Sequence, residues 1–179
     1  MRVYSAFDGC SGLQQSLKNE GIKVDTYLAS EVDKYPIAVT QYQFPDTIQM
    51  GDINLINPHT IKDITLMVAG SPCQDVSFSG LNRGLINGDR SNLFFKWVEH
   101  LNIIQPKYFI LENVRMKQEY QDIISEKLGV KPKMLPSSLV SAQKRDRFYW
   151  TNIDWKMPED KNLYLKDVLE CSCCSTDRM

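Results

Sequence analysis

The sequence predicts an α/β fold in which a mostly parallel sheet carries helices on both faces. Short apolar runs alternate along the chain with segments of helical spacing, and this alternation is typical of βαβ units. Turns rich in glycine and serine follow several of the apolar runs, which places polar loops at the strand ends. Ligands of open parallel sheets bind beyond the carboxyl ends of the strands, so we expect a site in these loops.

Each expected strand is a short run of apolar or β-branched residues between polar or glycine positions. The six strands are residues 2–7, 24–30, 47–50, 64–69, 108–111 and 147–150. Glycine or proline marks the ends of the helices between them, because these residues do not readily continue a helix: Gly21 follows the first, Pro106 the third and Gly129 the fourth. The four helices are residues 11–20, 33–43, 92–104 and 118–128.

The composition is that of an ordinary globular protein. With 179 residues, 42% of them hydrophobic and 24% charged, the chain is long enough for one domain with its own core. Its apolar runs are far shorter than the roughly 20 residues that span a bilayer, and its N-terminus lacks the apolar stretch of a signal peptide. We therefore expect an intracellular protein with no membrane partner. The net charge of −1 means that contact with nucleic acid must rest on local charge or on a part that this chain does not carry.

The five cysteines predict neither a disulfide framework nor a metal centre. Cys10 and Cys73 each follow an expected strand, and the other three crowd the C-terminus in the motif CSCC. An odd number in this arrangement does not form a regular set of pairs. The CSCC motif has no histidine or second cysteine pair near it to complete a zinc site, so no bound metal is expected.

Three loops at successive strand ends favour a cofactor that carries a nucleoside. In FDGCSG, Gly9 and Gly12 let the backbone approach a ligand beside a helix start. Glu31 can accept hydrogen bonds from ribose hydroxyls, and Asp52 can accept one from an adenine amino group. Each motif also has a plain structural alternative: a tight strand–helix connection, an acid that stabilises a helix N-terminus, and an ordinary Gly-Asp turn. Their coincidence at one sheet edge is what indicates a binding site.

Three further motifs place reactive groups at the same edge. AGSPCQ puts Cys73 in a polar loop directly after the apolar run 64–69, where a thiol can meet a substrate, whereas a packing cysteine would lie inside the strand. Glu112, in the motif ENV, is expected at the exit of the neighbouring strand as an acid or hydrogen-bonding group. Arg145 and Arg147, in QKRDR, can meet a substrate and a phosphate or backbone group. Taken alone, the same run is also consistent with a solvated charged surface.

In this order, the motifs FDGCSG, SEVDKY, GDI, GSPCQ, ENV and QKRDR resemble the catalytic domain of the C5-cytosine methyltransferases, over about residues 3–152. The context VSAQKRDRFYWTN is similar to the vertebrate de novo DNA methyltransferases and to their phage and bacterial relatives. The resemblance implies a Rossmann-like, S-adenosylmethionine-dependent methyltransferase fold. One departure is Ser11, which stands where the family's F-x-G-x-G-G turn commonly has its second glycine.

The resemblance implies S-adenosylmethionine as the methyl donor. Glu31 would hold the ribose hydroxyls, Asp52 the adenine amino group, and Leu93 would line the pocket. The residues implied to contact this cofactor are Phe7, Gly9, Cys10, Ser11, Gly12, Glu31, Asp52, Ile53 and Leu93.

The resemblance also implies covalent chemistry on a cytosine flipped out of DNA. Cytosine C5 is a poor nucleophile until a thiolate adds at C6, and Cys73 takes that role, with Arg145 as the nearby positive group. Glu112 would hold the N3 and amino edge of the base and protonate N3, and Arg147 would sit at O2. The residues implied to form the substrate pocket are Pro72, Gln74, Asn113 and Gln143.

Family members continue after the last strand into a target-recognition region. Residues 1–155 are expected to form the cofactor-binding and catalytic domain, and residues 156–179 a tail that starts a missing recognition region, which a second chain would supply. Two alternatives stay open: a non-catalytic or incomplete methyltransferase-like subunit that binds a partner chain, and a methyltransferase that acts on cytosine in RNA. A nucleotide-dependent oxidoreductase would need a fuller glycine fingerprint. The phage and bacterial relatives imply the cytoplasm of a bacterium or phage-infected cell, and a role such as restriction-modification.

Overall fold

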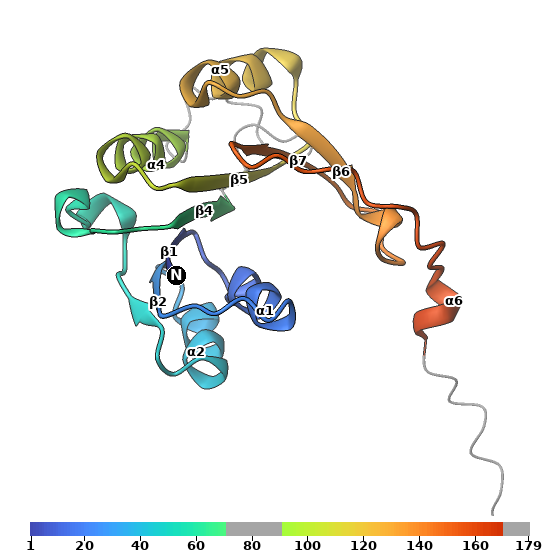
Figure 1. Ribbon diagram of the computed structural model, residues 1–179, viewed down its shortest axis with the longest axis horizontal. Coiled ribbons are helices and arrows are strands. Elements are labelled where there is room, and N and C mark those ends of the chain that lie inside the picture. The colour runs from blue at the N-terminus through green and yellow to red at the C-terminus, as the bar shows by residue number, and fades with distance from the viewer. Residues whose placement is uncertain (71–90, 170–179) are drawn as a thin grey trace, which may run out of the picture.

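The structure is a computed structural model that describes residues 1–70 and 91–169. A seven-stranded sheet forms its centre, in the order β3-β2-β1-β4-β5-β7-β6 (Figure 1). Strands β1 to β5 run parallel, whereas β7 is antiparallel to β5 and β6 is antiparallel to β7. The strands are β1 (Arg2–Ala6), β2 (Thr26–Ser30), β3 (Ile48–Gln49), β4 (Leu66–Gly70), β5 (Tyr108–Val114), β6 (Lys133–Pro136) and β7 (Asp146–Thr151). The predicted α/β class with a mostly parallel sheet is confirmed.

All four predicted helices are present, with ends within one residue of those expected. Three short 3₁₀ turns were not predicted, since each is only three residues long. The helices are α1 (Gly12–Asn19), α2 (Lys34–Gln43), α4 (Ser91–Ile104), α5 (Gln118–Leu128) and α6 (Leu165–Val168), and the 3₁₀ turns are η1 (Ile53–Leu55), η2 (Pro58–Thr60) and η3 (Ser137–Leu139).

Strand β6 was also missed in the sequence. It lies at the sheet edge and ends at Pro136, with Pro132 just before it. Proline has no backbone N–H to donate to a neighbouring strand. It is tolerated in an edge strand, where one side has no neighbouring strand to accept such a bond. Because these prolines interrupt the apolar run, the sequence pattern did not predict the strand.

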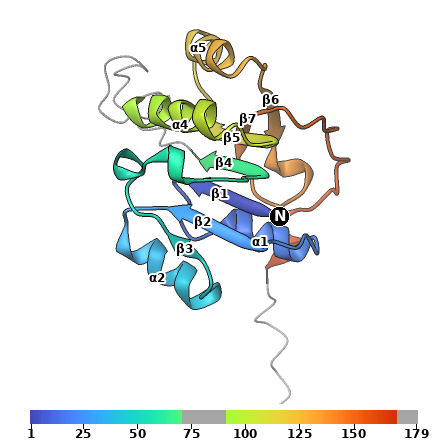
Figure 2. The same cartoon turned by 60° about the vertical axis from the view of Figure 1, so that its left-hand side comes forward.

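The two faces of the sheet are covered unequally. Helices α4 and α5 lie on one side and α1 on the other (Figure 2). The larger core cluster lies under α4 and α5 and includes the fully buried Trp97, Leu111 and Trp150. A smaller cluster lies under α1, around Val3 and Leu17. Burial of apolar area on the first face therefore dominates the stability of the fold.

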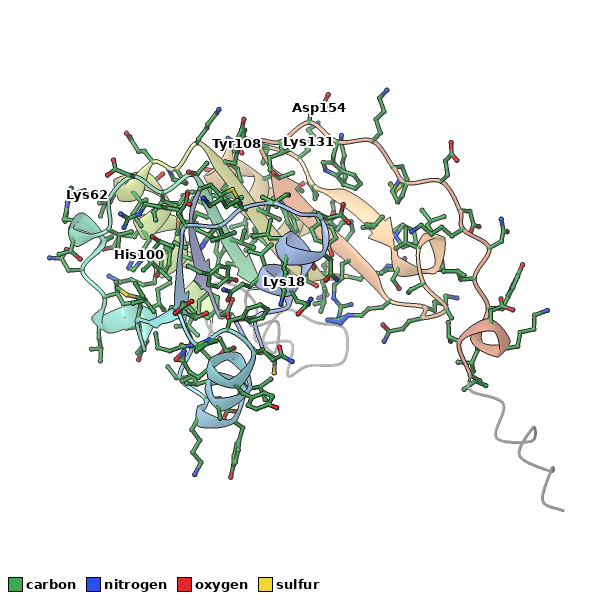
Figure 3. All side chains as sticks on the ribbon, turned by 60° about the horizontal axis from the view of Figure 1, so that its bottom comes forward. Lys18, Lys62, His100, Tyr108, Lys131 and Asp154 are labelled. Atoms are coloured by element: carbon green, nitrogen blue, oxygen red, sulfur yellow. The ribbon has the colours of Figure 1, made fainter. Side chains whose placement is uncertain are left out.

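One polar pair lies inside the larger core. The Tyr4 hydroxyl of β1 is 3.2 Å from Nδ1 of His100 in α4, and both residues are 0% exposed. Their rings stack at 6.0 Å between centroids. Figure 3 shows His100 within the body of the protein, whereas Lys62 and Asp154 project from its surface. Burial, assisted by the Lys96 ammonium, lowers the pKa of His100 to about 4, so the ring is neutral at pH 7.

This pair predicts a specific acid sensitivity. Because the folded pKa of His100 lies below its unfolded value, its neutral form stabilises the protein fully above about pH 6.5, and that stabilisation is lost as the pH falls towards about 4. The expected loss is about 3 kcal/mol of unfolding free energy, measured by urea unfolding across this pH range. His100→Leu should be less stable at pH 7 and should lack this part of the slope.

The second histidine provides the control, because His59 is exposed. His59→Asn should keep the wild-type slope. A His100→Leu protein with the same slope as wild type would show that another group causes the acid sensitivity.

Candidate active site

A cavity of about 410 Å³ opens at the carboxyl ends of β1 and β2. Five of the nine residues predicted to bind the cofactor line it: Phe7, Glu31, Asp52, Ile53 and Leu93. Sequence reasoning missed three other lining residues, Ser30, Val32 and Asn54. Each is a sequence neighbour of a predicted residue, and that adjacency was the only signal for them. The chain therefore brings its strand-end motifs to one place, as the parallel topology requires.

Glu31 is the best-anchored side chain of this cavity. Its Oε2 accepts the Gly9 N–H at 2.9 Å, and its Oε1 accepts the N–H groups of Val32 at 2.8 Å and Asp33 at 3.0 Å. The carboxylate thus joins the glycine turn after β1 to the start of α2. The carboxylate accepts backbone donors near a helix start, and it also lines the cavity. A carboxylate oxygen has two lone pairs, so further donors such as hydroxyls can still bind.

The glycine turn has a left-handed backbone at three positions. The φ angles are 55° at Phe7, 58° at Gly9 and 55° at Ser11. Ser11 is 0% exposed; its hydroxyl donates to the Asp8 carboxylate and accepts from Thr40 Oγ1 at 3.1 Å. Serine at this position therefore ties the turn to α2, which glycine could not do.

The four predicted turn residues Gly9, Cys10, Ser11 and Gly12 are not among the described residues that line the cavity. Gly9 connects to it through its hydrogen bond to Glu31. Cys10 and Gly12 are exposed, and the Ser11 hydroxyl is used within the protein. The turn supports the cavity wall through Gly9, and the other five predicted residues line the cavity.

Asp52 closes the opposite side of the cavity. Its Oδ1 accepts both the backbone N–H and the side-chain amide of Asn54 at 2.9 Å, which starts η1. In the described part of the chain its Oδ2 has no hydrogen-bond donor, and this atom can receive one from a ligand. The preceding Gly51 has a φ of 74°, and its carbonyl accepts the Ser30 hydroxyl at 2.7 Å. Ile53 is 2% exposed and provides an apolar wall.

Glu112 and Arg147 form an ion pair across β5 and β7. Arg147 Nε lies 2.7 Å from Glu112 Oε1, with the side chains 21% and 27% exposed. Although the atoms are close, Nε makes no aligned hydrogen bond within the described residues, so the contact is mainly electrostatic. Arg147 Nη1 donates to the Asp146 carbonyl at 2.9 Å. This pair brings together two of the residues predicted to act on the substrate.

The expected place of Glu112 at a strand exit was wrong. Strand β5 continues to Val114, because β7 pairs with it as far as Val114 and Arg147. Glu112 therefore lies inside the strand, paired with Gly70 of β4 and Tyr149 of β7. A Cβ on Gly70 would lie 3.7 Å from Glu112 Oε2, in ordinary van der Waals contact with this carboxylate. Burial and the Glu112 charge raise the pKa of Tyr149, and both nearby arginines oppose this effect.

The other predicted substrate residues are not gathered around this pair. Asn113 is 3% exposed and, by strand alternation, lies on the sheet face opposite Glu112; its amide oxygen accepts the Val114 N–H at 2.8 Å. Gln143 and Arg145 are exposed before β7, where Ser137 Oγ donates to the Gln143 carbonyl and accepts the Arg145 N–H. Pro72, Cys73 and Gln74 lie outside the described residues.

Residues 1–70 and 91–169 show neither a metal site nor a membrane span. They contain no cluster of three histidine, cysteine, aspartate or glutamate side chains arranged to hold a metal. Within the same residues, no helix combines the length and apolar character needed to cross a membrane.

Residues 1–168 match the family model of the C-5 cytosine-specific DNA methylases. The chain belongs to this family. It is 33% identical over 117 residues to an orphan methyltransferase of Bacillus phage rho11s, M.Rho11sI, and 32% identical over 133 residues to the type II methyltransferase M.NgoFVII of Neisseria gonorrhoeae. These matches cover 64% and 70% of this chain but only 23% and 35% of the relatives. The family predicted from the motifs is confirmed.

Solved structures confirm the fold. A putative DNA modification methyltransferase encoded within an Escherichia coli prophage matches with a TM-score of 0.74 and 23% identity, over 93% of this chain and 53% of its own. The Dnmt2 methyltransferase of S. pombe matches with a TM-score of 0.69 and 19% identity, over 88% of this chain and 53% of its own. The sheet is thus the Rossmann-like sheet of the methyltransferases, and this chain spans about half the length of these solved neighbours.

The geometry at Glu31 predicts a loss of stability in Glu31→Gln. A glutamine has one acceptor oxygen, so it cannot accept from the Gly9 N–H and from both α2 donors at once. The expected loss is about 1–2 kcal/mol of unfolding free energy, measured by urea unfolding. Glu126→Gln, at an exposed position of α5, is the matched control and should change stability by less than about 0.5 kcal/mol. Equal effects of the two substitutions would contradict the anchoring role.

Proposed function

We propose that this chain binds S-adenosylmethionine in the cavity between Glu31 and Asp52 and transfers its methyl group to C5 of cytosine in DNA. The observation that carries the proposal is the convergence of five predicted cofactor residues on one cavity of about 410 Å³. Membership of the C-5 cytosine-specific DNA methylase family supports the reaction and the substrate.

The residues present fit this cofactor. Glu31 presents a carboxylate with spare lone pairs to ribose hydroxyls, and Asp52 Oδ2 is available to an adenine amino group. Phe7, Ile53 and Leu93 supply apolar walls for the adenine ring. When bound, the cofactor supplies an electrophilic methyl group on a sulfonium.

The proposed chemistry starts with Cys73, whose thiolate adds to C6 of a cytosine flipped out of the duplex. This makes C5 nucleophilic, and C5 takes the methyl group. Loss of the C5 proton and expulsion of the thiolate then restore the aromatic ring. Glu112, in its protonated form, holds N3 and gives it a proton as the thiolate adds, and it regains that proton when the thiolate leaves. Its contact with Arg147 fixes the orientation of the carboxyl group. Arg147 Nη2 makes no hydrogen bond within the described residues and is available to cytosine O2.

The covalent step is tested with Cys73→Ser. DNA that carries 5-fluorocytosine cannot lose its C5 substituent as a proton, so the enzyme should remain attached to it in the presence of S-adenosylmethionine. We expect wild type to form a protein–DNA adduct that resists denaturation, and Cys73→Ser to fold but form none. Cys10→Ser is the control and should behave as wild type. An adduct with Cys73→Ser would refute the nucleophile, and an adduct on RNA alone would move the proposal to that substrate.

We also propose that a second polypeptide binds this chain, and one apolar surface supports this proposal. An open apolar hollow of about 190 Å³ lies over β5, β6 and β7 on the α1 side of the sheet, and apolar surface of this kind often marks a protein contact. Its lining residues are Ile110, Leu135, Tyr149, Thr151, Ile153 and Trp155. We propose that an apolar segment of a polypeptide that carries a target-recognition region packs there, since the solved neighbours are about twice as long as their match to this chain.

This surface can be tested with the part of M.Rho11sI that the chain does not match, produced as a separate polypeptide. Co-elution with this chain, and its loss in Ile153→Asp, would support the proposal. Complex formation that survives Ile153→Asp, or no complex at all, would count against it.

A further inference from the structure

Helix α2 has an inner face that packs on the protein and an outer face that meets solvent. The inner face carries residues that are buried or half-buried: Ile37, Thr40, Gln41 and Phe44. Thr40 is 0% exposed, and its hydroxyl lies 3.1 Å from that of Ser11, which attaches the helix to the glycine turn. The outer face carries four exposed residues at the spacing i, i+3, i+4 and i+7, which we call the α2 stripe: Tyr35, Ala38, Val39 and Tyr42.

The α2 stripe is a continuous row of apolar side chains in solvent. The exposed fraction is 71% for Tyr35 and 91% for Tyr42. Helix α2 lies at the outside of the molecule, and no described element covers its far side (Figures 1 and 2). Single exposed apolar residues are normal on a protein surface, but the spacing of this row is the one that a helix usually turns towards a packing partner.

The spacing of the stripe is symmetric about the midpoint between Ala38 and Val39. A two-fold axis at this midpoint would set α2 of a second copy antiparallel to α2 of the first. Tyr35 would then lie opposite Tyr42 of the second copy, and Ala38 opposite Val39. An interface between two identical copies uses the same patch on both, so the patch must match itself in this way. Aromatic pairs at the two ends and small residues in the middle allow close packing.

The charges at the ends of α2 favour the same arrangement. Lys34 is the only charged residue within the helix and lies at its N-terminal end, whereas the exposed Asp46 follows its C-terminal end. In an antiparallel pair, Lys34 of each copy comes to the end where Asp46 of the other copy lies. Lys18, whose Nζ is 5.7 Å from the centre of the Phe44 ring, comes in the same way to the end that carries Asp33. A parallel pair would instead bring the two copies of Lys34 together, and like charges oppose contact.

We propose that the α2 stripe is an interface between two copies of this chain, whose α2 helices pack antiparallel about a two-fold axis between Ala38 and Val39. The stripe lies at the β2–β3 end of the sheet, whereas the apolar hollow lies over β5, β6 and β7 at the other end (Figure 1). The two surfaces therefore do not compete. One row of side chains makes a small interface, so the dimer is expected to be weak, with a dissociation constant roughly in the micromolar range.

Sedimentation equilibrium of the full chain over a range of concentrations tests the interface with Val39→Asp. We expect wild type to dimerise and the variant to dimerise at least about tenfold more weakly, because the carboxylate would lose its water beside Ala38 of the second copy. Val39 is exposed, so the variant should keep the wild-type melting temperature. Leu165→Asp is the matched control: Leu165 is also apolar and exposed but lies outside the stripe, and this variant should dimerise as wild type does.

An exchange of charges tests the antiparallel arrangement. Lys34→Glu alone and Asp46→Lys alone should each weaken the dimer, because each places like charges at the ends that meet. The double variant restores opposite charges and should recover the wild-type dissociation constant to within about threefold. A double variant that dimerises no more tightly than the single variants would overturn the antiparallel arrangement.

Other results would assign the stripe to a different partner or the contact to a different surface. A wild-type chain that stays monomeric at its highest soluble concentration would overturn the proposal, and the stripe would then be open to another protein. A dimer that survives Val39→Asp would be held elsewhere. A dimer that is lost in Leu165→Asp would depend on the C-terminal segment, and either of these results would also overturn the proposal.

Discussion

The carboxylate of Glu31 is the contact on which the candidate site depends most. It accepts three backbone N–H groups, one from the glycine turn after β1 and two from the entry to α2. Without it, two loops that end neighbouring strands would have no shared anchor, and backbone donors near the cavity would need other partners. The same carboxylate faces the cavity, so the group that organises the loops is also the group offered to a ligand.

The parallel register extends this edge from the cavity to the ion pair. Ala6 of β1 is level with Ala69 of β4, and the next residue of β4, Gly70, is level with Glu112 of β5. Strand alternation then puts Glu112 and Arg147 on one face, where a carboxylate and a guanidinium 2.7 Å apart can hold a polar base edge. Arg147 lies on β7, which pairs antiparallel with β5, so a strand positions this guanidinium beside Glu112.

Local patterns in the sequence were sufficient to predict the strand-end motifs, the helices and the family. Contacts between residues far apart in the sequence could not be predicted from these local patterns. The end of β5 depends on pairing with β7, more than 30 residues away, so Glu112 was expected at an exit that lies two residues further on. The role of Ser11 depends on Thr40, 29 residues away, and its serine looked only like a departure from the glycine pattern. Tyr4 and His100, 96 residues apart, carried no motif at all.

The central claim is that the strand-end motifs form an S-adenosylmethionine pocket between Glu31 and Asp52. A crystal structure of the chain with S-adenosylhomocysteine tests it most directly. The account predicts the adenosyl group in this cavity, with ribose hydroxyls on the Glu31 carboxylate and the adenine amino group on Asp52. A ligand bound elsewhere, or a cavity that stays empty at saturating concentration, would contradict it.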